Sequence, residues 1–333
     1  MAELPSTLPT TLAAITPWLL ERQQDLETSV PLPDPDAAAG AVPARLCATA
    51  FLYDGGVAAT LVARRAQART LADLGAPPVL AELAAARAGI VLVAGPGGAG
   101  KSATVAALLE AINDGPGRHV LLLQDEAQAP ASRRAVFTAR ELTGAAAVDN
   151  ALRAAPRQGV DVVVLDPLPD LALLPRLCEV ASAGVLVLCG LRAGSSIHAA
   201  AQLLSGFPNE AVGQAALSAC LRGLIYQTPC RGVGGRWHAA YEVLLDSAER
   251  RGASSLDSAK RSGAPFFEGA GLLTALRDPD ALAAYVQAGR RRGMQTLSMG
   301  LRRLQQSAAI TEDELERLDP ERHRFQAPSL QDL

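Results

Sequence analysis

Short apolar runs and longer amphipathic segments alternate along the middle of the chain. The short runs predict buried strands, and segments with apolar residues at helical spacing predict helices. The predicted strands span residues 90–95, 119–124, 161–165 and 184–190, and the predicted helices span 78–89, 101–113, 171–182 and a segment ending near Arg153. Strands and helices that alternate in this way form a mostly parallel sheet with helices on both faces. We therefore expect an α/β fold.

The pattern is different before this region. Residues 9–30 have apolar positions at helical spacing, and residues 31–43 hold four prolines, which indicates a loop or short linker. Residues 44–63 predict two strands around a turn at 54–56. A small α/β module is thus expected ahead of the main domain.

The C-terminal third is expected to be largely helical from about residue 196. One strand pair is predicted around residues 235–245, and the polar, Gly- and Ser-rich stretch 248–271 indicates an irregular insertion. At 333 residues the chain fits two domains. We place them at residues 1–75, including the linker, and 76–333.

Composition and charge exclude several classes of protein. The formal net charge of −3 gives no basic field of the kind that a nucleic-acid partner requires, so none is expected. The five cysteines lack CxxC spacing, which argues against a zinc site or disulfide framework. An acidic residue near the N-terminus and the lack of a long apolar run predict a cytoplasmic protein, with any membrane association made through partners.

The sequence GPGGAGKS, residues 95–102, follows a predicted strand and opens a predicted helix. In that context the pattern GxxxxGK[ST] predicts a phosphate-binding loop, whose backbone N–H groups surround phosphate oxygens. The predicted ATP-binding residues of this segment are Gly95, Pro96, Gly97, Gly98, Ala99, Gly100, Lys101, Ser102 and Ala103. Lys101 would reach the β- and γ-phosphates, and the Ser102 hydroxyl would hold Mg²⁺.

Two predicted strands end in acids that hydrolysis could use. Asp125 and Glu126 follow the strand that ends at residue 124, and Asp166 follows the strand 161–165. Glu126 and Asp166 are the candidate catalytic carboxylates, and Asp125 is a candidate ligand of the nucleotide. An acid at the end of a strand also caps helices and forms turns, so that reading stays open.

With its flanks, the loop resembles the PilT family, the retraction ATPases of type IV pili. The similar segments are 70–80, 90–114, 151–161, 235–245 and, most specifically, GMQTLSMGL at 293–301. The resemblance implies a PAS-like N-terminal domain, here shortened, a RecA-like P-loop ATPase core and a helical C-terminal extension. It also implies ATP and Mg²⁺ as ligands, a hexameric ring, an inner-membrane platform protein as partner, and a role in pilus retraction and twitching motility.

The departures from the family fall on chemistry. Gln128 stands where the family has its catalytic glutamate, Pro167 where the Walker B strand has glutamate, and Arg192 where the His box has histidine. A guanidinium stays charged near phosphates, so Arg192 would hold ATP without turning it over. We expect ATP binding with weak or absent hydrolysis. The alternatives are a motor that uses Glu126 or Asp166, and an inactive regulatory or structural subunit that docks on an intact pilus motor or the platform.

Other arginines are weaker candidates for the nucleotide. Arg64, Arg65 and Arg69 fall where the family reaches nucleotide from its N-terminal domain, although a solvated face explains them as well. Arg153 and Arg157 match arginines of the family.

Overall fold

The computed structural model describes residues 26–31, 45–53, 56–64, 68–124, 130–142, 144–245, 272–276 and 279–320. The chain divides into two compact units, Met1–Ala68 and Arg69–Leu333. The predicted insertion 248–271 and most of the predicted helix 9–30 lie outside the described residues. No helix in the described part of the chain is both long and apolar enough to cross a membrane.

The first unit contains a three-stranded antiparallel sheet, in the order β1-β2-β3. The strands are β1 (Leu26–Pro31), β2 (Arg45–Tyr53) and β3 (Gly56–Arg64). The predicted pair of strands at 44–63 is confirmed, because β2 and β3 pair from Arg45 and Arg64 to Tyr53 and Gly56. The helix prediction is wrong for residues 26–30, which pair with β2. Thr28 and Val30 are β-branched and favour such an extended strand.

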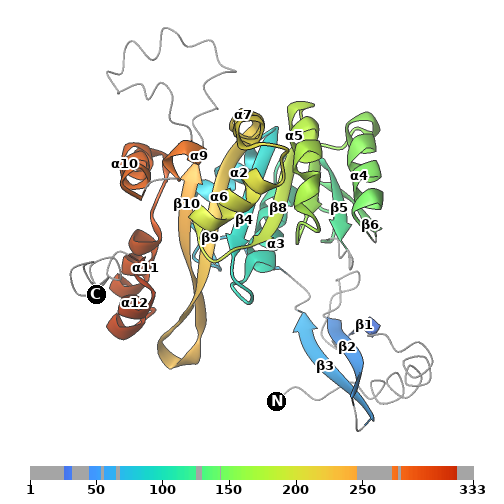
Figure 1. The fold of residues 1–333 in the computed structure, drawn as a ribbon. Helices are drawn as coiled ribbons and strands as arrows, with labels where there is room; N and C mark the ends of the chain where they lie inside the picture. The colour runs from blue at the N-terminus through green and yellow to red at the C-terminus, as the bar shows by residue number, and fades with distance from the viewer. Residues whose placement is uncertain are drawn as a thin grey trace. The chain divides into compact units, whose positions relative to one another are not determined.

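The second unit is built on a seven-stranded sheet in the order β10-β9-β4-β8-β7-β5-β6 (Figure 1). The strands are β4 (Gly89–Gly95), β5 (His119–Gln124), β6 (Val136–Glu141), β7 (Val162–Leu165), β8 (Leu186–Arg192), β9 (Leu221–Arg231) and β10 (Trp237–Leu245). All neighbours pair in parallel except β9 and β10. The predicted mostly parallel sheet is confirmed, and with it the α/β class.

Helices cover both faces of this sheet. The helices of the second unit are α2 (Val79–Ala85), α3 (Lys101–Asp114), α4 (Ala145–Ala154), α5 (Leu174–Ser182), α6 (Ser196–Ser205), α7 (Glu210–Cys220), α9 (Leu272–Ala275), α10 (Pro279–Gly289), α11 (Leu297–Gln306) and α12 (Glu312–Leu318). The connection through α3 runs from β4 toward β5, whereas α5 leads back from β7 to β8. Because such crossovers are right-handed, the reversal places α3 and α5 on opposite faces. Figure 1 shows α5 and α6 in front of the sheet and α3 behind it.

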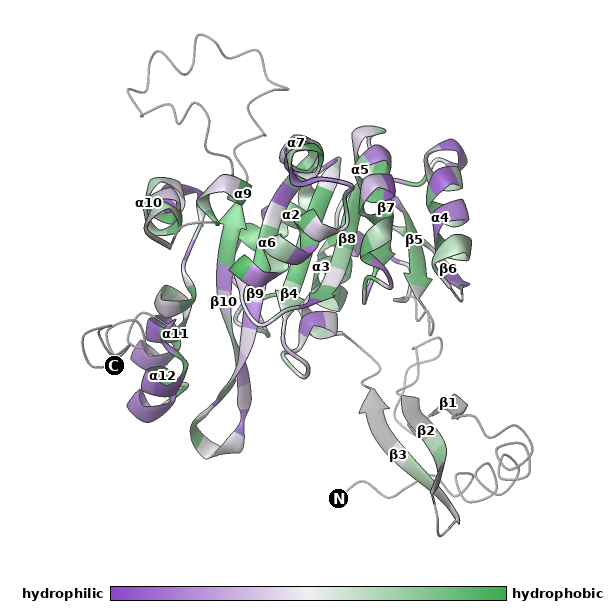
Figure 2. Cartoon of the chain, in the orientation of Figure 1, coloured by the Kyte–Doolittle hydropathy of each residue, from purple (hydrophilic) through white to green (hydrophobic). Residues whose placement is uncertain are grey.

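The two layers of helices explain the composition of the strands. Every residue of β4 and β7 is buried, and both strands are aliphatic runs without alternation. Parallel strands covered on both faces have this pattern, and Figure 2 shows the central strands in green. The outer helices α11 and α12 are mainly purple in the same view, because they pack with one side only.

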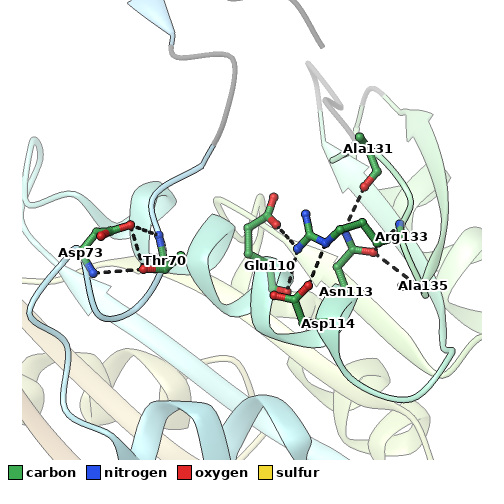
Figure 3. Close-up of polar contacts among 8 residues, drawn as sticks. All are labelled: Thr70, Asp73, Glu110, Asn113, Asp114, Ala131, Arg133 and Ala135. Carbon is green, nitrogen blue, oxygen red and sulfur yellow. Dashed lines mark hydrogen bonds and ion pairs between the residues drawn. The ribbon is translucent and has the colours of Figure 1, made fainter. Parts of the chain in front are cut away.

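The C-terminal end of α3 is fixed to the segment before β6 (Figure 3). Asn113 is fully buried; its amide donates to the Ala131 carbonyl at 2.9 Å, and its Oδ1 accepts from the Arg133 N–H at 3.0 Å. Arg133 also pairs with Glu110 at 2.5 Å and Asp114 at 2.8 Å. A buried amide that is bonded on both sides is costly to move, so α3 is held firmly at the end opposite its N-terminus.

Two strands of the sheet, β6 and β9, were not predicted from the sequence. β6 is an exposed edge strand, with five of its six residues exposed, so it has no apolar run to reveal it. β9 lies in the third of the chain expected to be mostly helical, and it pairs with both β10 and β4. The predicted strand pair therefore extends the central sheet instead of standing apart. Helix α2 ends at Ala85, short of the predicted end at Gly89.

Candidate functional site

The candidate site lies at the edge of the sheet where the parallel strands have their carboxyl ends. The loop 95–100 connects β4 to α3 there, and the neighbouring strands β8 and β7 end beside it at Arg192 and Leu165. The helices that follow β4 and β8 leave on opposite faces of the sheet. Ligands of open α/β sheets bind in the crevice that such a reversal creates.

The loop has the shape that its glycines allow. Gly100 precedes α3 with a φ of 84°, in the left-handed region, and it has no side chain to cap the helix. At Gly95 a Cβ would stand 2.3 Å from the Gln227 carbonyl oxygen, so only glycine lets β4 approach β9 this closely. The first N–H groups of α3 have no acceptor within the helix and point into the loop. Such N–H groups form an anion-binding site.

Gln227 of β9 supports the loop from below. Its side chain is fully buried, and its amide donates to the Ala99 carbonyl at 2.6 Å. Its Oε1 atom has no hydrogen-bond partner among the described residues. Sequence reasoning missed this residue; a lone glutamine in the apolar run of β9 was the only available signal.

Lys101 is the first residue of α3, and its ammonium group lies over the loop. It donates to the carbonyls of Gly95, at 2.9 Å, and Pro96, at 2.8 Å. Partial burial lowers the pKa of Lys101, the carboxylate of Asp166 opposes that shift, and the cation of Arg192 adds to it. The side chains of Lys101, Asp166 and Arg192 thus lie near enough to one another to interact electrostatically.

Asp166 follows β7 and packs against β8. A Cβ at Gly190 would come within 1.9 Å of the Asp166 Oδ1 atom, so the carboxylate occupies the space that the missing side chain leaves. The Leu168 N–H also donates to the Gly190 carbonyl at 2.8 Å. The absence of a side chain at Gly190 therefore determines where the Asp166 carboxylate lies. Gly190 belongs to the segment that stands in place of the family's His box.

Arg192 ends β8 directly beside the loop. It is opposite Gly95 in the register of β4 and β8, and the next residue, Ala193, donates its N–H to the Gly95 carbonyl at 3.1 Å. The Arg192 side chain is exposed, at the carboxyl edge of the sheet. A bound phosphate would therefore meet a second permanent cation besides Lys101.

Several predicted residues are not brought to this edge or cannot be placed. Asp125, Glu126 and Gln128 lie outside the described residues, so their roles stay predictions. Arg153 and Arg157 precede β7, at the opposite edge of the sheet, and Arg153 pairs with Asp149 at 3.0 Å. Within one chain these two arginines do not join the loop.

A second contact behind α3 was also missed. Thr104 is fully buried, and its hydroxyl lies 3.3 Å from the hydroxyl of the buried Tyr241 of β10. Burial raises the pKa of Tyr241, so this phenol stays neutral. The pair fixes the first turn of α3 against the sheet, and Ser102 and Ala103 of the same turn are exposed.

The residues present fit a nucleotide and Mg²⁺. The N–H groups at the start of α3 and the two cations Lys101 and Arg192 suit phosphate oxygens. The exposed Ser102 hydroxyl and the nearby Asp166 carboxylate are oxygen donors, which Mg²⁺ prefers. A mostly parallel sheet with this loop at its carboxyl edge defines a P-loop protein with a RecA-like fold.

Comparison with known proteins narrows this class. The model of the family "Type II/IV secretion system protein" matches residues 61–240, more than half of the chain, so the chain belongs to this family. The chain is 27% identical to the type IV pilus retraction ATPase PilT of Pseudomonas aeruginosa over 81% of its own length and 74% of that protein. It is 28% identical to a twitching motility protein of Neisseria gonorrhoeae over 67% of its own length and 59% of that protein.

Solved structures agree on the fold. A crystal structure of the pilus retraction motor PilT with bound ADP superposes with a TM-score of 0.71 at 23% identity, covering 94% of this chain and 84% of that one. The ATPase DotB of Legionella pneumophila gives a TM-score of 0.64 at 19% identity, over 91% and 79% of the two chains. The resemblance to PilT-like ATPases is confirmed, and so is the fold class. The PAS-like character of the first unit stays a prediction.

Proposed function

We propose that this protein binds ATP as a component of a type IV pilus machinery and hydrolyses it weakly or not at all. The proposal rests on a contrast within one site, between an intact phosphate-binding loop and altered residues around it. The loop and Lys101 are arranged to bind phosphates, whereas the end of β8 presents the cation of Arg192 where the related ATPases have histidine. Binding is preserved and the groups that activate water are replaced.

Each residue has a part in binding. Lys101 exchanges its two carbonyl acceptors in the loop for phosphate oxygens, and the N–H groups of α3 donate to the same anion. Arg192 holds the phosphates from the side of β8. Mg²⁺, held by the Ser102 hydroxyl, would neutralise phosphate charge. Gln227 keeps the loop in this shape from beneath.

Hydrolysis also needs a group that takes a proton from water. A missing general base costs about 10²- to 10⁴-fold in rate. Enzymes turn over at about 10 s⁻¹ on average, so we expect about 0.1 s⁻¹ or slower here. The Gln128 amide can orient a water molecule and cannot accept its proton.

A second candidate function is a working motor, and the position of Asp166 favours it. This carboxylate lies close enough to Lys101 to act on its pKa, so it is near the phosphates. In that case Asp166, or Glu126, takes the place of the absent glutamate and the protein drives pilus retraction.

The partners follow from the family. We propose that the chain assembles with itself into a hexameric ring, or with a related pilus ATPase, and docks on an inner-membrane platform protein from the cytoplasm. The similarity to PilT over most of the chain supports this assembly.

The two functions differ in a direct experiment. ATP binding and steady-state phosphate release are measured for the wild type, Lys101→Ala, Asp166→Asn and Glu126→Gln. The binding role predicts ATP affinity that is lost in Lys101→Ala and phosphate release that is equally low in all four proteins. A wild-type rate well above that of Lys101→Ala, abolished by Asp166→Asn or Glu126→Gln, would establish the motor.

A further inference from the structure

A basic cavity lies at the other edge of the sheet, away from the phosphate loop. Its volume is about 560 Å³, and it is formed by the residues that lead into α2, the start of β9, the end of β10, the 3₁₀ turn η5 (Arg290–Arg292) and α11. The start of β9 and the end of β10 mark the edge where β4 begins. β4 has seven residues, so roughly 20 Å separate this edge from the phosphate loop. One nucleotide cannot occupy both places.

The lining is dominated by arginine. Five arginines line the cavity: Arg222, Arg290, Arg291, Arg292 and Arg303. Among the described residues that line it, Glu82 is the only acid. The whole chain is weakly acidic, with a net charge of −3, so this cluster of positive charge is a local feature. Guanidinium groups keep their charge at every pH a cell reaches, and their mutual repulsion favours a bound anion.

The backbone holds these arginines in place. Gly293 ends the η5 turn with a φ of 90°, and a Cβ there would stand 2.8 Å from the Val79 Cβ, so the turn sits directly against α2. The Arg222 Nε donates to the Ala88 carbonyl at 2.9 Å, and its side chain lies across Gly89. The backbone of the turn and the strand that carry Arg222 and Arg290–Arg292 therefore needs little reordering when a ligand binds.

We propose that this cavity binds a small phosphorylated molecule, at a site separate from the phosphate loop. The volume lies within the range of small-molecule sites, about 300–1,000 Å³. Planar guanidinium groups match phosphate oxygens with paired hydrogen bonds. Apolar wall residues, Pro77, Leu83 and Leu245 among them, can contact the uncharged part of such a ligand. A ligand here joins α2, which follows the first unit, to the C-terminal helices.

The test separates this cavity from the phosphate loop. Full-length Lys101→Ala protein, whose loop is disabled, is titrated with inorganic tripolyphosphate and with ADP by calorimetry at about 150 mM salt, a physiological ionic strength. We expect saturable one-site binding of at least one of them. This binding should weaken tenfold or more when Arg290→Gln, Arg291→Gln and Arg303→Gln are added.

The preferred ligand indicates the chemistry of the site. Binding of tripolyphosphate alone would indicate an inorganic ligand, and a preference for ADP would indicate a nucleotide. Because the loop is disabled throughout, the result does not depend on the proposed function.

A control variant has the same loss of charge elsewhere. Arg134→Gln, Arg140→Gln and Arg236→Gln remove three exposed arginines outside the cavity, and binding should stay within threefold. Equal weakening in both triple variants, or no saturable binding at all, would overturn the proposal. So would a cavity variant that keeps tripolyphosphate and ADP binding but loses self-association or binding to phosphatidylglycerol vesicles. Thermal unfolding of both variants shows that they are folded, and Arg222 is kept because it also bonds to Ala88.

Discussion

Gln227 beneath the phosphate loop gives the sharpest prediction, because its side chain has one good hydrogen bond and one orphaned atom. Gln227→Leu removes the 2.6 Å bond to the Ala99 carbonyl, which leaves that buried oxygen unpaired and costs about 1 to 3 kcal/mol. The same change removes the unpaired, buried Oε1, whose burial costs a similar amount. The two contributions nearly cancel, so the free energy of unfolding should change by about 1 kcal/mol or less.

The affinity for ATP, by contrast, should fall in Gln227→Leu, because no such cancellation applies to it. Without the tether at Ala99 the loop has to be ordered by the ligand, at the expense of about one hydrogen bond, 0.5 to 1.5 kcal/mol. That energy corresponds to a roughly 2- to 12-fold weaker dissociation constant for ATP. Calorimetric titration with ATP measures the affinity, and denaturant unfolding without nucleotide measures the stability.

A second glutamine serves as a matched control. The Gln214 amide donates to the Thr274 hydroxyl at 2.7 Å, between α7 and α9 and away from the loop. Gln214→Leu should leave ATP affinity unchanged. If Gln227→Leu binds ATP like the wild type but unfolds several kcal/mol more easily, Gln227 is a residue of the core alone and the reasoning about the loop is wrong.

Two further predictions concern Gly190 and the buried Glu314. Gly190→Ala should displace the Asp166 carboxylate, so its rate of phosphate release should equal that of Asp166→Asn, whereas Gly194→Ala, whose methyl would meet His198 at an ordinary 3.8 Å, should keep the wild-type rate. A Gly190→Ala rate above that of Asp166→Asn would contradict this. Glu314 accepts two hydrogen bonds from Arg317 and one from the Arg231 N–H, which hold its pKa below the usual value. Its contribution, about 1 to 2 kcal/mol, is present above pH ~4.5 and is lost as the pH falls through the lowered pKa. Urea unfolding from pH 7 to 3 should show a smaller loss of stability in Glu314→Gln than in the wild type, and parallel curves would refute it.

The sequence predicts this fold best where burial is complete on both faces. β4 and β7 are continuous aliphatic runs because helices cover them on both sides, and the loop between β4 and α3 has a specific motif. β6 is exposed at the edge of the sheet and has no such run. Its position depends on pairing with β5, which local sequence does not encode.

The residues that support the site, Gln227 and Gly190, could not be predicted from the sequence for a related reason. Gln227 comes under the loop only because β9, far along the chain, pairs with β4. In the same way, Gly190 meets Asp166 only because β8 lies next to β7. Such contacts between distant segments follow from the topology of the sheet. The motif at residues 95–102, and the residues Gln128 and Pro167 that stand in place of the family's glutamates, can instead be read directly from the sequence.

The most direct test of the account is a single-turnover measurement. The wild-type protein is mixed with less than one equivalent of ATP labelled at the γ-phosphate, and bound ATP and free phosphate are followed over time beside Lys101→Ala. The account predicts that ATP is retained by the wild type and not by Lys101→Ala, with phosphate appearing at about 0.1 s⁻¹ or slower. Rapid conversion of the bound ATP, at about 10 s⁻¹, would contradict it and identify the protein as a working motor.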